Sequence, residues 1–103
     1  MEPKEYTILP IFNDCLDAFF SNRILSILNE VDDFAKGKIK RPVPRECGKY
    51  PQPRWKFLLP KNKIIVMYWE ESENLQFFAA MEQDNKIHQE LYRKMLLDKN
   101  LDH

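Results

Sequence analysis

The chain holds a cluster of basic side chains that could contact a polyanion. Residues 36–63 contain ten Lys or Arg residues and one acidic residue, Glu46, so this segment has a formal charge of +9. Because the whole chain is formally neutral, the remaining residues sum to −9. Charges segregated in this way create a local positive potential that attracts nucleic acids and acidic protein surfaces. The alternative is a solvated loop whose lysines serve only solubility.

Two of these cations lie in a segment with the alternation of a β-strand. In residues 54–59, Arg54 and Lys56 alternate with three apolar residues, which places the two cations on one face of the strand. RNA cleavage without a metal requires a base for the 2′-hydroxyl, an acid for the leaving oxygen and cations for the phosphate. Lys56, flanked by Arg54 and with Lys63 expected on the adjacent strand, is our candidate centre for this chemistry.

Other basic and aromatic residues of the same region are candidate RNA ligands. Cations would contact phosphates, and aromatic rings would stack on unpaired bases. These candidates are Lys38, Lys40, Arg41, Arg45, Lys49, Tyr50, Trp55 and Lys61.

The N-terminal part predicts a strand followed by helical structure. Residues 6–11 are rich in β-forming residues, and Asn13 could then cap a helix. Apolar residues recur at three- and four-residue intervals over residues 14–36, which indicates one long helix or a pair broken near Ser21 and Asn22. Periodicity does not decide between these two, and Gly37 supplies a C-terminal stop.

The remainder predicts a loop, three strands and a last helix. Residues 37–53 contain both glycines and four prolines, so we expect an extended loop without regular structure. Residues 54–59, 64–70 and 75–81 predict an antiparallel meander, and Asp84 could cap a C-terminal helix. The fold class is therefore predicted as α+β, with a core formed by Leu16, Phe20, Ile24, Leu28, Val31, Phe57, Ile64, Val66, Tyr68, Phe77 and Ala79.

This order of elements resembles the RelE/ParE superfamily of bacterial and archaeal toxins over roughly residues 6–92. The resemblance rests on Lys56 within the RWKFL run of residues 54–58, on the VMY run of residues 66–68, and on the PVPRE run of residues 42–46. It implies one RelE/ParE-like domain over residues 1–103. In that fold, an N-terminal helical pair packs on a curved antiparallel sheet of about four strands, with a C-terminal helix.

The resemblance also implies a function within a toxin-antitoxin system. The RelE branch cleaves messenger RNA, often on the ribosome, whereas the ParE branch inhibits DNA gyrase, and an antitoxin neutralises each toxin. We therefore expect a cytoplasmic, metal-independent endoribonuclease (a hydrolase) without a cofactor, which binds RNA and a cognate acidic antitoxin. Lys56, Arg54 and Tyr92 carry over as site residues, with Lys63 and His88 as further candidates.

Departures from the family pattern keep a second function open. RelE-like sequences usually have an arginine at the position of Ile65, and often an arginine at the position of Gln89, directly after a histidine. The alternative is a non-enzymatic protein, either a ParE-like gyrase inhibitor or a degenerate module that binds nucleic acid or protein.

Other classes of function find little support in the sequence. The two cysteines, Cys15 and Cys47, are too few for a disulfide framework and lack a metal-binding spacing. We expect Cys15 to be a small buried hydrophobic residue rather than a nucleophile. No apolar run approaches the roughly 18 residues that span a membrane, so no membrane association is expected.

Overall fold

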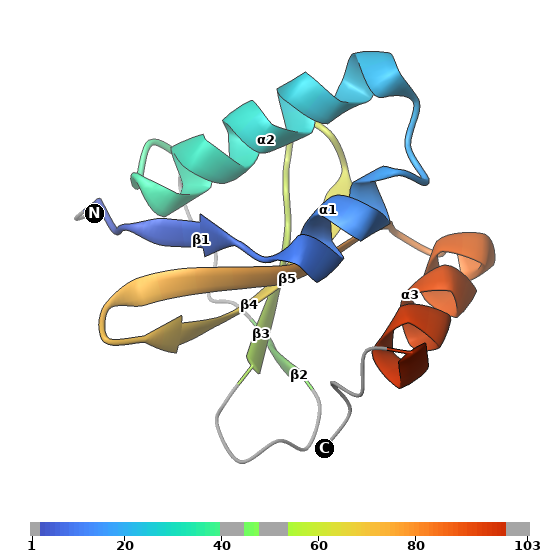
Figure 1. Cartoon of the computed structure of the whole chain (residues 1–103). Coiled ribbons are helices and arrows are strands. Elements are labelled where there is room, and N and C mark those ends of the chain that lie inside the picture. Colours follow the sequence, from blue (N-terminus) through green and yellow to red (C-terminus); the bar gives the residue numbers. More distant parts are fainter. Residues whose placement is uncertain (1–2, 40–44, 48–53, 99–103) are drawn as a thin grey trace.

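A short strand and two helices form the N-terminal part of the protein (Figure 1). The computed structural model describes residues 3–39, 45–47 and 54–98. Strand β1 is Tyr6–Ile8, helix α1 is Pro10–Leu16 and helix α2 is Ser21–Ala35. Pro10 therefore begins a helix instead of ending a strand, because the first helical position needs no N–H donor and favours the φ that proline fixes. The predicted cap at Asn13 is wrong, since Asn13 lies within α1.

The helical stretch is a pair, and its break changes the core. The chain leaves helical geometry between Leu16 and Ser21, so Phe20 stands in extended conformation just before α2 and is 80% exposed. The prediction that Phe20 is a core residue is therefore wrong, and its neighbour Phe19 is buried instead. The stop at Gly37 is confirmed. Gly37 has a φ of 73°, and the amides of Gly37 and Lys38 donate to the carbonyls of Phe34 and Asp33, as in a Schellman motif.

Five strands form one mixed sheet. The other four are β2 (Arg45–Cys47), β3 (Arg54–Leu58), β4 (Ile64–Glu71) and β5 (Asn74–Glu82), and the sheet order is β1-β5-β4-β3-β2. The antiparallel meander of β3, β4 and β5 is confirmed. Two features differ from the prediction. Strand β1 pairs with β5 in parallel, and β2 forms within the segment expected to be an irregular loop, where it pairs with β3.

Helix α3, Lys86–Asp98, follows the last strand. Its cap is Asn85 rather than the predicted Asp84, because the Asn85 Oδ1 accepts the backbone N–H of His88 at 3.1 Å. Asp84 instead has a φ of 59° in the turn that precedes the helix. Figure 1 shows α3 beside α1 and the end of β5, apart from α2.

The core lies between one face of the sheet and the helices α1 and α2 (Figure 1). Phe34 of α2 packs against the rings of Phe57, Tyr68 and Phe77, which come from three different strands. The predicted core residues Leu16, Val31, Phe57, Ile64, Val66, Tyr68, Phe77 and Ala79 are buried, and Ile24 and Leu28 are partly buried against them. The α+β class with a helical pair packed on the sheet is thus confirmed.

Candidate nucleic-acid interface

A cavity of about 320 Å³ lies on the sheet face opposite α1 and α2. Strand alternation explains its floor, because Phe57 and Val66 turn into the core while their neighbours Lys56, Ile65 and Met67 turn to the other face. Helix α3 forms the wall. The lining residues are Lys56 of β3, Ile65 and Met67 of β4, Met81 of β5, and Gln89, Tyr92 and Arg93 of α3.

The register of the strands brings these residues together. Lys56 pairs with Met67 across β3 and β4, and Ile65 pairs with Met81 across β4 and β5. Directly opposed residues of a sheet project from the same face, so Lys56 stands beside an apolar floor. Two of the predicted site residues, Lys56 and Tyr92, therefore line one cavity although they lie far apart in the sequence.

Tyr92 and Arg93 bring an aromatic ring and a second cation to the cavity. The Tyr92 ring lies 6.5 Å from that of Phe78 and packs against the core, so its position is fixed by the sheet. The guanidinium of Arg93 is exposed and its Nη1 lies 2.7 Å from Glu90 Oε1 on the same helix. An exposed pair of this kind is worth little, about 0–1 kcal/mol, so Arg93 can exchange Glu90 for a phosphate.

Arg54 lies near this cavity but does not line it. Its guanidinium carbon lies 5.0 Å from the ring centroid of Trp69 and 4.9 Å from that of Phe78. Such cation–π contacts are worth about 0.5–2 kcal/mol, depending on how far the cation is desolvated. Arg54 thus connects β3 to the aromatic side chains of β4 and β5, and its charge faces rings rather than the cavity beside Lys56.

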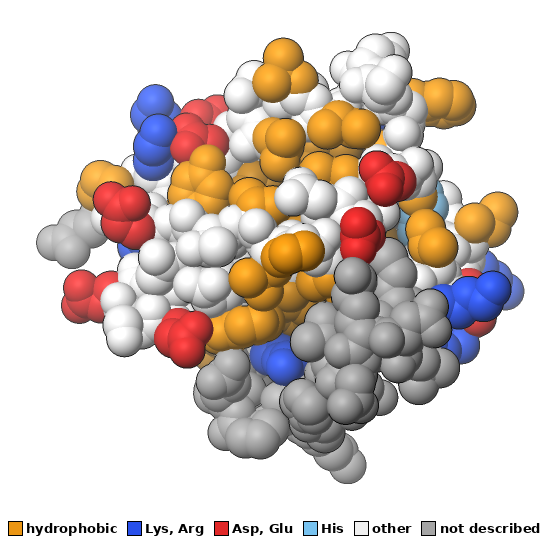
Figure 2. Space-filling model, viewed as in Figure 1, with side chains coloured by type: hydrophobic (Ala, Val, Ile, Leu, Met, Phe, Trp, Pro, Cys, Tyr) orange, Lys and Arg blue, Asp and Glu red, His pale blue; other side chains and the backbone are white. Residues whose placement is uncertain are grey.

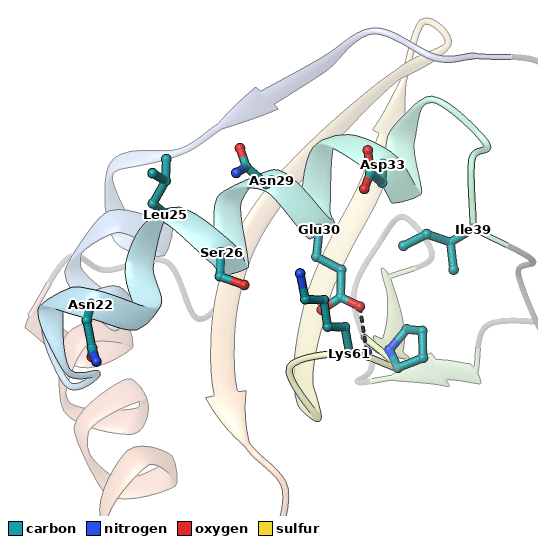
Figure 3. A pocket seen from close by; sticks show the side chains of 9 residues that line it. Asn22, Leu25, Ser26, Asn29, Glu30, Asp33, Ile39 and Lys61 are labelled. Carbon is teal, nitrogen blue, oxygen red and sulfur yellow. Dashed lines mark hydrogen bonds between the residues drawn. The ribbon is translucent and has the colours of Figure 1, made fainter.

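Lys61 and Lys63 lie in the turn between β3 and β4, at the α2 side of the molecule. Glu30 of α2, only 4% exposed, accepts the backbone N–H groups of Lys61 at 2.6 Å and Asn62 at 2.9 Å (Figure 3). The Asn62 side-chain amide also donates to Glu30, at 2.9 Å. Lys63 has a φ of 58° and precedes β4, which begins at Ile64. The prediction that Lys63 lies on a strand beside Lys56 is therefore wrong.

A larger groove of about 710 Å³ runs between this turn and α2. Figure 3 shows its lining side chains projecting from successive turns of α2, with Lys61 facing them. They are Asn22, Leu25, Ser26, Asn29, Glu30 and Asp33 from α2, together with Ile39, Pro60 and Lys61. Of the predicted site residues that the structure describes, only Lys61 lines this groove, and its backbone N–H donates to Glu30.

His88 lies at the junction of α3, β5 and the connector before α2. Its Nδ1 accepts the backbone N–H of Glu82 at 3.1 Å, and its ring lies 4.7 Å from the ring of Phe19. Its Nε2 lies 3.9 Å from Glu82 Oε1. His88 is buried and does not line the cavity of Lys56, so its contacts are those of a residue that joins α3 to the sheet.

Three of the remaining candidate RNA ligands, Trp55, Lys38 and Arg45, fall within the described residues. Trp55 is partly buried against the core and shares a strand face with Phe57, so it lies on the opposite side from Lys56. Lys38 is exposed just after α2, and Arg45 pairs with Lys56 in the register of β2 and β3. Lys40, Arg41, Lys49 and Tyr50 lie outside the described residues.

On the face that Figure 2 shows, the described Lys and Arg side chains lie at separate places, with Asp and Glu side chains near some of them. Lys36 pairs with Asp32 at 2.9 Å, and Arg23 lies 3.7 Å from Glu82. Acidic partners thus offset the charges of Lys36 and Arg23.

Sequence reasoning did not select four residues of the cavity: Met67, Met81, Gln89 and Arg93. Gln89 and Arg93 resemble an ordinary solvated helix face in the sequence. Their spacing to Tyr92 was the available signal, because residues 89, 92 and 93 fall on one side of a helix. In the sequence, Met67 and Met81 lie in apolar runs typical of a core. Only the strand register shows that they face the cavity.

Other kinds of site find no support in the part of the chain that the structure describes. Within residues 3–39 and 54–94, no group of three His, Cys, Asp or Glu side chains could hold a metal ion. Cys15 is buried, as predicted, and burial raises the pKa of its thiol. None of the described helices has the length and apolar run needed to cross a membrane.

Comparison with known proteins leaves the fold and the cavity as the basis for assigning a function. No family model, no curated protein and no solved structure was found to match this chain.

Proposed function

We propose that the cavity of Lys56 binds single-stranded RNA and cleaves it without a metal, in the manner of a RelE-like toxin. The observation that carries this proposal is that Lys56 and Tyr92, two residues that the family resemblance selects, line the same cavity. Arg93 lies beside them and supplies a guanidinium, the group that the family pattern leads one to expect at the position of Ile65.

The chemistry assigned to this cavity is attack of the 2′-oxygen on the adjacent phosphorus. The new bond joins the 2′-oxygen to phosphorus and the bond to the 5′-oxygen breaks, which leaves a cyclic phosphate and a 5′-hydroxyl. Lys56 and Arg93 stabilise the negative charge that grows on the phosphate oxygens. The Lys56 amine takes the 2′-hydroxyl proton and becomes the ammonium that faces the phosphate, and the Tyr92 hydroxyl gives its proton to the leaving 5′-oxygen.

Non-enzymatic binding is the second candidate function, and two placements favour it. Ile65 puts an aliphatic chain on the cavity floor where a catalytic arginine is expected, and the charge of Arg54 faces Trp69 and Phe78. A ParE-like inhibitor or a degenerate binding module would keep the fold without needing those cations. An acidic antitoxin as partner fits either candidate and stays a prediction.

Replacement of Lys56 by alanine separates the two functions. We expect Lys56→Ala to slow RNA cleavage by about a hundredfold or more, because it removes a base or a transition-state cation. Affinity should fall only severalfold, because several cations share the phosphates. Cleavage of messenger RNA is measured with purified protein alone and on translating ribosomes, and binding by fluorescence anisotropy.

Lys86→Ala is the matched control, because Lys86 is an exposed lysine at the start of α3 and does not line the cavity. It should leave both rate and affinity unchanged. If messenger RNA stays intact both with purified protein alone and on translating ribosomes, the nuclease proposal is contradicted. Growth arrest that persists in the Lys56→Ala variant would then support the non-enzymatic candidate.

A further inference from the structure

The cavity of Lys56 separates charged from apolar groups in a way that suits one nucleotide. Its volume of about 320 Å³ is at the lower end of the range of small-ligand sites, so it suits a single base rather than a length of strand. Ile65, Met67 and Met81 form an apolar floor, where an unpaired phosphate would pay a large desolvation cost. A phosphate therefore belongs beside Lys56 and Arg93, and the base belongs over the floor.

The floor and wall present the surfaces on which a planar base packs. Tyr92 offers an aromatic ring, and base–aromatic stacking is worth about 1–3 kcal/mol. The methionine thioethers of Met67 and Met81 are polarizable and pack well against aromatic rings. None of these contacts distinguishes one base from another, because every base has an aromatic face.

Gln89 is the lining residue that can distinguish bases. Among the described residues that line the cavity, it alone carries a side-chain amide, which presents one acceptor and two donors side by side. A glutamine pairs with two neighbouring groups of adenine, its N6 donor and its N7 acceptor. Guanine presents two acceptors on the same edge, so the Gln89 oxygen would face an acceptor there.

We propose that this cavity is a nucleobase subsite in which Gln89 reads the Hoogsteen edge of the base, at N6 and N7, and thereby selects adenine. The inference rests on the proposed RNA binding and extends it to sequence preference. Gln89 takes the position after His88 where the family pattern often has an arginine, so the selection is a property of this chain.

The test uses four labelled heptaribonucleotides that differ only in the central base, within a run of uridines. The central nucleotide carries a 2′-hydrogen, so that the strand cannot be cleaved there. All four strands have the same charge, and the phosphate contribution to binding is therefore constant. Affinities are measured by fluorescence anisotropy for the wild type, Gln89→Ala, Gln89→Arg and the control Gln83→Ala, whose residue is exposed in the turn after β5.

We expect the wild type and Gln83→Ala to bind the adenine strand about tenfold more tightly than the guanine strand. Gln89→Ala should bring all four strands within about twofold, and Gln89→Arg should favour guanine, because arginine pairs with its O6 and N7. Tight binding without a base preference, or an adenine preference that survives Gln89→Ala, would overturn the subsite and leave RNA binding intact. Failure to bind any of the four strands would overturn RNA binding and the subsite together.

Discussion

Tyr6 joins the first strand to α2 through a single hydrogen bond. Its hydroxyl donates to Asp32 Oδ1 at 2.7 Å, and Lys36 Nζ lies 2.9 Å from Asp32 Oδ2. The Asp32 carboxylate thus contacts Tyr6 of β1 and Lys36, which lies just after α2. The hydrogen bonds from Lys36 and Tyr6 lower the pKa of the Asp32 carboxyl, whereas burial and Asp32 raise the pKa of Tyr6 to about 12.

This pair predicts a loss of stability at alkaline pH. Because the folded pKa of Tyr6 lies above its unfolded value of about 10, the contribution of its hydroxyl is complete below pH 10 and disappears as the pH rises toward 12. Tyr6→Phe should lower the free energy of unfolding by about 1 kcal/mol at pH 7. It should also flatten the stability profile between about pH 10 and 12, measured by urea unfolding. Equal slopes in wild type and variant would contradict this account.

Among the elements, the turn between β3 and β4 makes most of its hydrogen bonds to α2 through one carboxylate, and Arg23 adds one to the Asn62 carbonyl at 3.0 Å. Glu30 accepts three hydrogen bonds from Lys61 and Asn62, and Asn62 also donates to Ser26 Oγ at 3.2 Å. We expect Glu30→Gln to destabilise the protein by about 2 kcal/mol, because its amide hydrogens would face backbone donors and leave at least one unsatisfied. Urea unfolding measures the loss, and hydrogen exchange at Lys61 and Asn62 locates it.

Asp33→Asn is the control for the same groove, because Asp33 lines it without bonding to the turn. That variant should leave both stability and exchange close to wild type. If Glu30→Gln leaves the amides of Lys61 and Asn62 as slow to exchange as before, the turn is held by its own geometry instead.

Elements with a strong local pattern could be predicted from the sequence. The runs that became β3, β4 and β5 are rich in aliphatic and aromatic residues and are separated by turn residues, and Gly37 marks the end of α2 by its own conformational freedom. Features that depend on a distant partner could not be predicted. The pairing of β1 depends on β5, the strand at 45–47 depends on β3, and the orientation of the Lys63 turn depends on Glu30.

The candidate site shows the same contrast between residues predictable from a local pattern and residues whose place depends on a distant partner. Lys56 could be selected because strand alternation fixes its face, whereas its companions come from a helix whose docking the sequence does not specify. His88 is a candidate because the family pattern often has a histidine there, whereas its hydrogen bond with Glu82 and its contact with Phe19 are packing contacts.

At the scale of the whole molecule, described cations of the basic segment lie on two sides. Lys56 lines the cavity, whereas Lys61 lines the groove beside α2 and Lys63 follows in the same turn. Each phosphate contact on single-stranded RNA contributes about 0.7 to the slope of log affinity against log salt. We therefore expect the double variant Lys56→Ala, Arg93→Ala to lower that slope by about 1.4, measured between 50 and 300 mM salt by anisotropy.

The paired control is Lys61→Gln with Lys63→Asn, since asparagine tolerates the positive φ of residue 63. This variant removes the same number of charges from the α2 side and should leave the slope unchanged. A larger loss of slope from the turn variant would place the RNA beside α2 instead of at the cavity.

The parallel pairing of β1 with β5 also determines when the protein can fold during its synthesis. Phe12 and Phe34 both pack on Phe77, so the apolar faces of α1 and α2 cannot be fully covered until β5 has been synthesised. At roughly 5–20 residues per second, translation takes about 3 to 13 seconds to travel from β1 to β5. Throughout that interval the nascent chain presents unpaired aromatic side chains to chaperones and proteases. A chain whose synthesis stops before residue 74 lacks β5 entirely and would be degraded rather than released as an active fragment.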